Sequence, residues 1–118
     1  MIIIGLFGGL GAVSRFALGN FISKYNKTSF PYGTFLMNII GSMFLGITYH
    51  FYIDRKISAD IWLFFGVGFL GGFTTFSTFS YEAIQLFISK KYKIAIFYVL
   101  LSTILCILSA YLGLNIFT

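Results

Sequence analysis

Four long apolar runs, separated by three short polar links, constrain this chain more than any other feature. Each run is long enough for an α-helix to cross a bilayer, which takes about 20 residues. The chain is 58% apolar and only 9% charged, whereas soluble domains carry about 25% charged residues on average. So few charges cannot cover a water-soluble fold. We therefore predict an all-α membrane protein whose single domain consists of four transmembrane helices.

The predicted spans leave both termini on one side of the membrane. The first and third links carry five lysines, whereas the middle link has only Arg55 and Lys56. Because cytoplasmic loops are enriched in basic residues, the first and third links are favoured to be cytoplasmic. The bias is modest, so the chain either inserts in both orientations or forms one fixed-orientation half of a pair. The spans are residues 2–23, 32–53, 61–89 and 94–117.

The net charge of +5 comes from basic residues that lie beside the spans. Contacts with lipid headgroups account for these residues better than nucleic acid does. Arg15 is different, because it lies well inside the first span, where a charge is expensive. Its depth favours a water-filled vestibule over a side chain that merely reaches the interface.

Two further spans carry polar residues at helical spacing, so each set shares one helix face. Such stripes serve equally well as interhelical hydrogen bonds or as the lining of a conduit. Two stripes together with Arg15 favour a path lined by hydrogen-bond donors. The stripes are Thr34, Asn38 and Ser42 in the second span, and Tyr98, Ser102, Cys106 and Ser109 in the fourth.

The segment Gly71–Ser80 in the third span combines paired glycines with a run of Ser and Thr. Glycine weakens a helix, and hydroxyl side chains compete for backbone hydrogen bonds. We predict a helix break near Gly71–Thr74, whose freed carbonyls can coordinate a small cation. Phe76 and Phe79 share a face, and the positive edge of a phenyl ring can contact an anion. Aromatic packing accounts for this pair slightly better on chemistry alone.

These residues also carry a family resemblance, which covers nearly the whole chain. The chain resembles the CrcB/Fluc fluoride channels in three stretches, of which the third is the longest and the most specific. They are Gly8–Phe16, Gly33–Asn38 with Gly41 and Ser42, and Gly71–Glu82. The resemblance implies an antiparallel, dual-topology dimer in a bacterial cell membrane. Such a dimer passively exports fluoride through two pores, each lined by both subunits.

The resemblance also implies roles for single residues. The carbonyls of Gly71 and Thr74 are expected to hold a structural sodium ion between the subunits of a homodimer, or of a heterodimer with a related chain. Arg15 and Glu82 are expected at vestibules. Cys106 stands where the family's polar track continues with serine, and a thiol is a poorer donor. The expected pore residues are Thr34, Asn38, Phe76, Ser77, Thr78, Phe79, Tyr98 and Ser102.

Three other function classes fit the sequence less well. A small proton-coupled cation or drug exporter needs a carboxylate deep in its first span, but that span has Arg15 and no acid. In a non-transporting membrane scaffold, all the polar groups would only pack helices. An enzyme is not supported, because one histidine, one cysteine and three acids assemble no nucleophile–base pair or metal cluster.

Overall fold

The computed structural model describes residues 1–117, which form helices joined by short links. Four helices are long and apolar enough to cross a membrane, which confirms the predicted all-α membrane fold. The longest dimension is 48 Å, close to the thickness of a bilayer with its headgroups, about 40–45 Å. The protein is therefore a multi-pass membrane protein.

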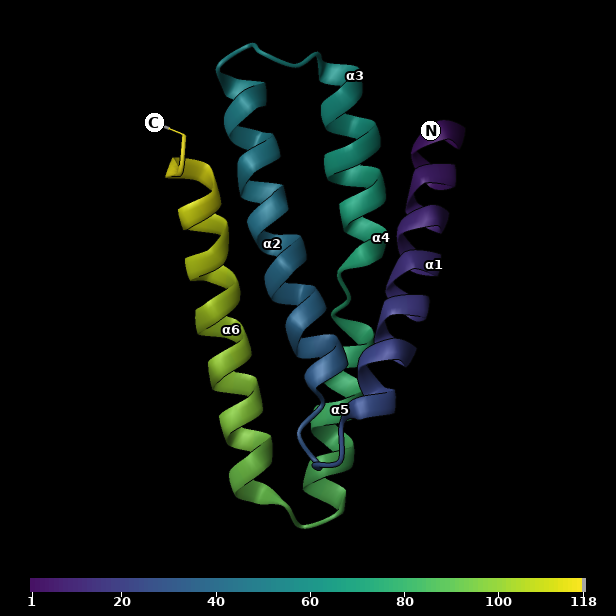
Figure 1. The fold of residues 1–118 in the computed structure, drawn as a ribbon, viewed down its shortest axis with the longest axis vertical. Coiled ribbons are helices and arrows are strands. Elements are labelled where there is room, and N and C mark those ends of the chain that lie inside the picture. Colours follow the sequence, from purple (N-terminus) through teal and green to yellow (C-terminus); the bar gives the residue numbers. More distant parts are fainter. Residues whose placement is uncertain (118) are drawn as a thin grey trace.

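The third span is divided into several helical segments, whereas the other three spans are each one helix (Figure 1). Both termini and the α2–α3 link lie at one end, and the other two links lie at the opposite end. The elements are α1 (Ile2–Tyr25), α2 (Tyr32–Ile53), α3 (Ala59–Ile61), the π-helix η1 (Trp62–Leu70), α4 (Gly71–Phe73), α5 (Ser77–Ile88) and α6 (Tyr92–Asn115).

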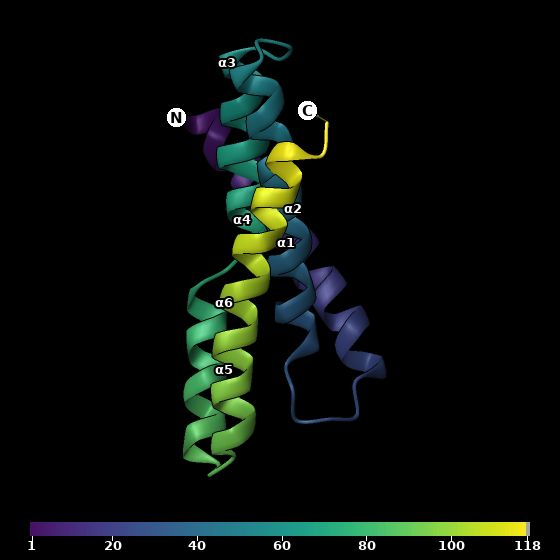
Figure 2. The ribbon, with the colours of Figure 1, turned by 90° about the vertical axis from the view of Figure 1, so that its left-hand side faces the viewer.

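The third span changes its packing partners along its length. Helices η1 and α4 pack against α1, whereas α5 packs against α6. Figure 2 shows this crossing, with α5 beside α6 and α1 on the other side of α2. Helix α2 packs along α6. The segment between α4 and α5 is therefore a crossing point where all the packed helices come near.

Glycines allow the helices to approach at backbone distance. A Cβ on Gly72 would collide with the carbonyl oxygen of Gly8, and a Cβ on Gly46 would collide with that of Ala110. Small residues that let helix backbones approach closely are typical of membrane interfaces. The first contact fixes α4 on α1, and the second fixes α2 on α6.

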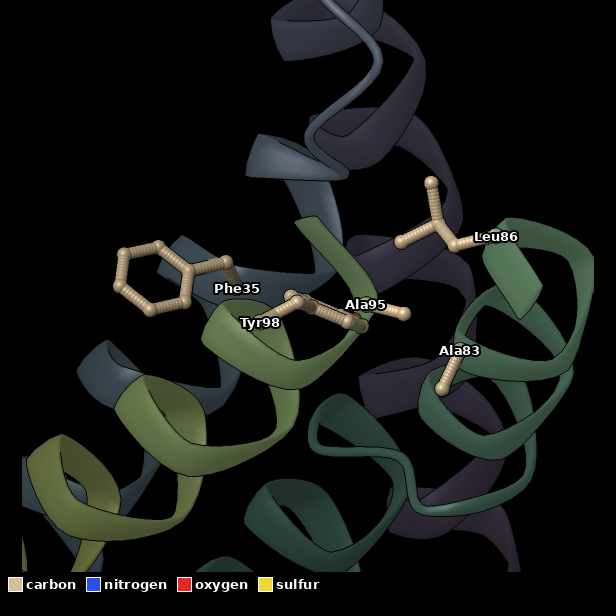
Figure 3. Close-up of a cluster of buried hydrophobic side chains, with 5 residues drawn as sticks. All are labelled: Phe35, Ala83, Leu86, Ala95 and Tyr98. Carbon is tan, nitrogen blue, oxygen red and sulfur yellow. The ribbon is translucent and has the colours of Figure 1, made fainter. Parts of the chain in front are cut away.

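A cluster of buried side chains joins α2, α5 and α6 at the end of the bundle that carries the lysine-rich links. It contains Phe35, Ala83, Leu86, Ala95 and Tyr98, which Figure 3 shows on these three helices. Many large apolar side chains elsewhere point outward. Such a surface suits lipid or another subunit, since neither requires polar groups.

The helix break is present, but it lies further along the chain than we predicted. Gly71–Phe73 remain helical, and the interruption covers residues 74–76. Gly72 allows α4 to pack closely on α1. The backbone leaves the helix further on, where Asn38 hydrogen-bonds to Thr75. The π-helix before it was not predicted. Such wide turns are often found at functional sites.

Candidate functional site

A cavity of about 660 Å³ lies between α2, the third span and α6, beside the helix break. The polar faces of α2 and α6 meet here, because Asn38 and Ser42 face Ser102 and Cys106 across it. Cys106 lies beside Ser42. Three glycines, at positions 41, 66 and 71, also line the cavity. The side formed by the break consists of Thr74, Thr75, Phe76 and Phe79.

Phe76 and Phe79 flank the start of α5 and both line this cavity. Their ring centroids lie 6.1 Å apart with the rings tilted by 45°. The Phe76 ring is 79% exposed, whereas Phe79 is half-buried against Tyr98, with centroids 5.0 Å apart. The pair is therefore not a closed packing stripe within this chain, because Phe76 is largely exposed.

Asn38 holds the break open. Its Oδ1 accepts the N–H of Thr75 at 2.8 Å, and its Nδ2 donates to the carbonyl of Thr75 at 3.0 Å. The backbone groups fix the orientation of the amide, since an N–H must face oxygen and a carbonyl must face nitrogen. The hydroxyl of Thr75 also accepts the N–H of Thr78 at 3.2 Å, at the start of α5. Thr75 is thus fixed through its N–H, its carbonyl and its hydroxyl.

Arg15 reaches the same segment from α1. Its Nε donates to the Gly72 carbonyl at 3.2 Å, and its Nη1 donates to Thr78 Oγ1 at 3.3 Å. The guanidinium therefore spans the break and joins α4 to α5, in a half-buried position. A planar fork with several donors suits this role, because it can serve two acceptors in fixed directions.

The other polar candidates lie toward the end of the bundle with the lysine-rich links. Thr34 Oγ1 donates to Glu82 Oε1 at 2.5 Å, and Glu82 lines a second, smaller cavity. Tyr98 and Ser102 are 0% and 3% exposed. Their hydroxyls are the buried side-chain polar atoms of residues 1–117 that have no hydrogen-bond partner. An unpaired buried hydroxyl costs about 1–3 kcal/mol. Thr34 lies beside Tyr98, and both unpaired hydroxyls can still donate to a ligand.

The carbonyls of Gly71 and Thr74 lie at the edge of the break. The N–H of Thr75 is donated to Asn38 and not back to Gly71. Within the described part of the chain, no hydrogen bond to either carbonyl oxygen is found. A Cβ on Gly71 would meet no atom within 4 Å. Within residues 1–117, both oxygens therefore have no hydrogen-bond donor.

Comparison with known proteins identifies the family. The family model described as "CrcB-like protein, Camphor Resistance (CrcB)" matches residues 2–114. The chain belongs to the CrcB family. A Bacillus cereus relative named fluoride-specific ion channel FluC 2 is 42% identical over 115 residues, covering 98% of this chain and 94% of the relative.

Two other relatives of this CrcB-family chain carry similar names. A Clostridium acetobutylicum protein, also named fluoride-specific ion channel FluC 2, is 42% identical. The match covers 94% of this chain and 92% of that relative. A Phocaeicola vulgatus protein named fluoride-specific ion channel FluC is 42% identical, and the match covers 96% of this chain and 93% of that relative. The similarity therefore extends over the whole bundle and not over one motif.

Within this CrcB-family fold, the predicted site residues fall into separate groups. Asn38, Phe76, Phe79 and Ser102 share the larger cavity with Gly71 and Thr74. Thr34 contacts Glu82 at the smaller cavity. Ser77 and Thr78 line neither cavity, and Thr78 turns toward Arg15.

Sequence reasoning missed Thr75 as the fixed centre of the break, although it lies inside the segment that we singled out. Its role depends on Asn38, which is 37 residues away in the chain, and no local pattern signals that pairing. The smaller cavity was also missed. Its walls come from two links and α5, whose proximity follows only from the tertiary fold.

Proposed function

We propose that this chain is a fluoride-selective ion channel that passively exports fluoride across the cell membrane and so lowers cytoplasmic fluoride. The observation that carries the proposal is the larger cavity, where Phe76 and Phe79 lie near the unpartnered hydroxyl of Ser102. The names of the relatives, at about 40% identity over nearly the full length, support the same function.

The mechanism follows from the donors that remain available. Fluoride holds water strongly, so a pore must replace those waters with other hydrogen-bond donors. The hydroxyls of Tyr98 and Ser102 can donate, and Asn38 keeps one amide N–H beyond its bond to Thr75. Ring edges at Phe76 and Phe79 add weak positive contacts. None of these groups carries a full positive charge, so the ion can bind and also leave.

Thr34 extends the proposed path toward the smaller cavity through its bond to Glu82. Ser77, which is exposed, and Thr78, whose hydroxyl accepts a hydrogen bond from Arg15, also belong to the proposed pore. Selection against chloride would follow from the width of the path and the fixed positions of its donors.

We propose that the working unit is an antiparallel dimer, either a homodimer or a heterodimer with a related chain. The exposed ring of Phe76 supports this, because a pore wall in one subunit needs a partner to enclose it. The cavity is likewise lined by only three elements of this subunit, namely α2, the third span and α6. A second copy inserted in the opposite orientation would cover the same face.

The free carbonyls of Gly71 and Thr74 fit a structural sodium ion shared by two subunits. Hard cations take oxygen ligands, and broken helices supply such ligands through backbone carbonyls. One subunit offers two oxygens, so a symmetric pair would offer four. The cation would hold the two breaks together and would take no part in conduction.

Fluoride efflux from proteoliposomes tests the function. The protein is reconstituted with potassium fluoride inside, and a potassium ionophore balances the charge while an electrode measures fluoride outside. We expect rapid fluoride efflux and far slower chloride efflux from matched vesicles. A folded sample that passes no fluoride, or that passes chloride equally well, would refute the channel. A map of the dimer with density ringed by the four carbonyls would test the sodium site.

A further inference from the structure

The smaller cavity, of about 240 Å³, opens at the end of the bundle that carries the lysine-rich links. Its walls come from the α1–α2 link, from α5 and from the α5–α6 link. Five of its seven lining residues are polar, whereas many large apolar side chains are exposed on the outer faces of the helices. The polar lining residues are Ser29, Glu82, Gln85, Ser89 and Lys91.

Two opposite charges occupy different depths of this cavity. Glu82 is half-buried and accepts a hydrogen bond from Thr34, whereas Lys91 is exposed. The ammonium of Lys91 donates to Ser29 Oγ at 2.5 Å and so joins the two links. In residues 1–117 the one salt-bridge contact, with nitrogen and carboxylate oxygen within 4.0 Å, joins His50 and Asp54 at 3.2 Å. The charge of Lys91 is therefore not neutralised by a carboxylate, and it remains available at the lip of the cavity.

A line of polar groups leads from this cavity into the protein. Glu82 contacts Thr34, and it lies close enough to Tyr98 to act on it electrostatically. Tyr98 and Ser102 carry the unpartnered hydroxyls, and Ser102 borders the larger cavity. The smaller cavity therefore lies at the outer end of this line of polar groups, where an ion path along it would open to water. A carboxylate at the floor of the mouth of an anion path would repel the ion unless a positive charge offsets it.

We infer that Lys91 forms an anion-capture site at this mouth, which concentrates small hydrated anions and offsets the charge of Glu82. The inference rests on the proposed channel function, since it names the residue that feeds the path. A cleft with low-dielectric walls focuses the field of a charge and raises the local concentration of an oppositely charged ion. Capture by an exposed charge also weakens as salt screens it.

The test compares Lys91→Met with Lys93→Met in phosphatidylcholine vesicles. Lys93 is an exposed lysine at the same end of the bundle but does not line the cavity. Both variants therefore remove one positive charge from the same side of the membrane, so they affect membrane orientation equally. Fluoride efflux is measured at ionic strengths of about 0.01 M and about 0.15 M, where the screening length falls from about 30 Å to about 8 Å. Lys91→Met should lower efflux about three- to tenfold at low salt, and the loss should shrink at high salt. Lys93→Met should match the wild type at both.

Two more variants separate the charge of Lys91 from its structural hydrogen bond to Ser29. Lys91→Arg keeps the charge and should retain efflux, and Ser29→Ala removes only the partner of the ammonium and should also retain it. If Ser29→Ala loses as much as Lys91→Met, or if the loss is the same at both salt levels, Lys91 is a brace and the inference fails.

Two further outcomes would also overturn it. If Lys91→Met has an effect only in vesicles with anionic lipid, Lys91 binds headgroups and not the permeating ion. If the wild type conducts and Lys91→Met equals Lys93→Met, the capture site fails while the channel stands. A wild type that passes no fluoride refutes both proposals.

Discussion

Asn38→Asp changes one atom of the group that holds the break, and its effect can be estimated from two contacts. The carboxylate can still accept the N–H of Thr75, but it faces the carbonyl of Thr75 where the amide donates at 3.0 Å. The lost bond and the unsatisfied carbonyl cost about 1–3 kcal/mol. A full negative charge about 5 Å from a permeating anion adds about 3 kcal/mol of repulsion at an effective dielectric of about 20.

The repulsion alone corresponds to a loss of about two orders of magnitude in flux, since about 1.4 kcal/mol is a factor of ten. The efflux assay measures it, and size-exclusion chromatography checks that the protein remains assembled. Asn38→Ala is the matched control, because it removes both bonds to Thr75 without adding charge. We expect Asn38→Ala to lose less flux than Asn38→Asp. Flux within twofold of wild type for Asn38→Asp would show that the path does not pass this residue.

Three other perturbations test separate parts of the site. Phe76→Ile should cut fluoride efflux sharply without loss of assembly, because an aliphatic side chain has no positive ring edge; unchanged efflux would remove the aromatic pair from the pore. Gly72→Ala should lower the free energy of unfolding by about 1–3 kcal/mol, because the new Cβ collides with the Gly8 backbone. Gly9→Ala is the control and should not destabilise the protein, since its Cβ meets no atom within 4 Å. Detergent-induced unfolding measures both. Arg15→Lys should speed amide hydrogen exchange across residues 74–78, since one ammonium cannot reproduce the two guanidinium bonds, and equal exchange would contradict the bracing role.

The fold was predictable because the bilayer allows few solutions. An apolar run of about 20 residues has to form a helix in lipid, where each backbone group must be satisfied internally. Four such runs therefore predicted four helices with both termini at one end. The π-helix and the exact break at residues 74–76 were not predictable. They depend on contacts between segments distant in the chain, such as that between Asn38 and Thr75.

The residues that line the candidate site were largely predictable. Which of their polar groups are already hydrogen-bonded within the protein was not. Helical spacing alone indicated that Asn38 and Ser42 share a face, as do Ser102 and Cys106, and the structure brings the two faces to one cavity. The sequence could not indicate which polar groups would already be hydrogen-bonded. Arg15 illustrates this, because its depth in the first span did not indicate that it donates to Gly72 and Thr78 at the break. Its place at a vestibule stays a prediction.

The polar residues fall into those that hold the broken backbone and those that have no protein partner. This separation lets a short chain meet two requirements with few polar residues. Broken backbone in a membrane needs fixed partners, and Asn38 and Arg15 supply them. A permeating ion needs donors that no protein group has taken, and the hydroxyls of Tyr98 and Ser102 meet that condition. If both hydroxyls were paired, their burial would be less costly, but a dehydrated anion would find no donor between the two cavities. The unpaired state therefore destabilises the fold, and under the proposed function it leaves two donors for the ion.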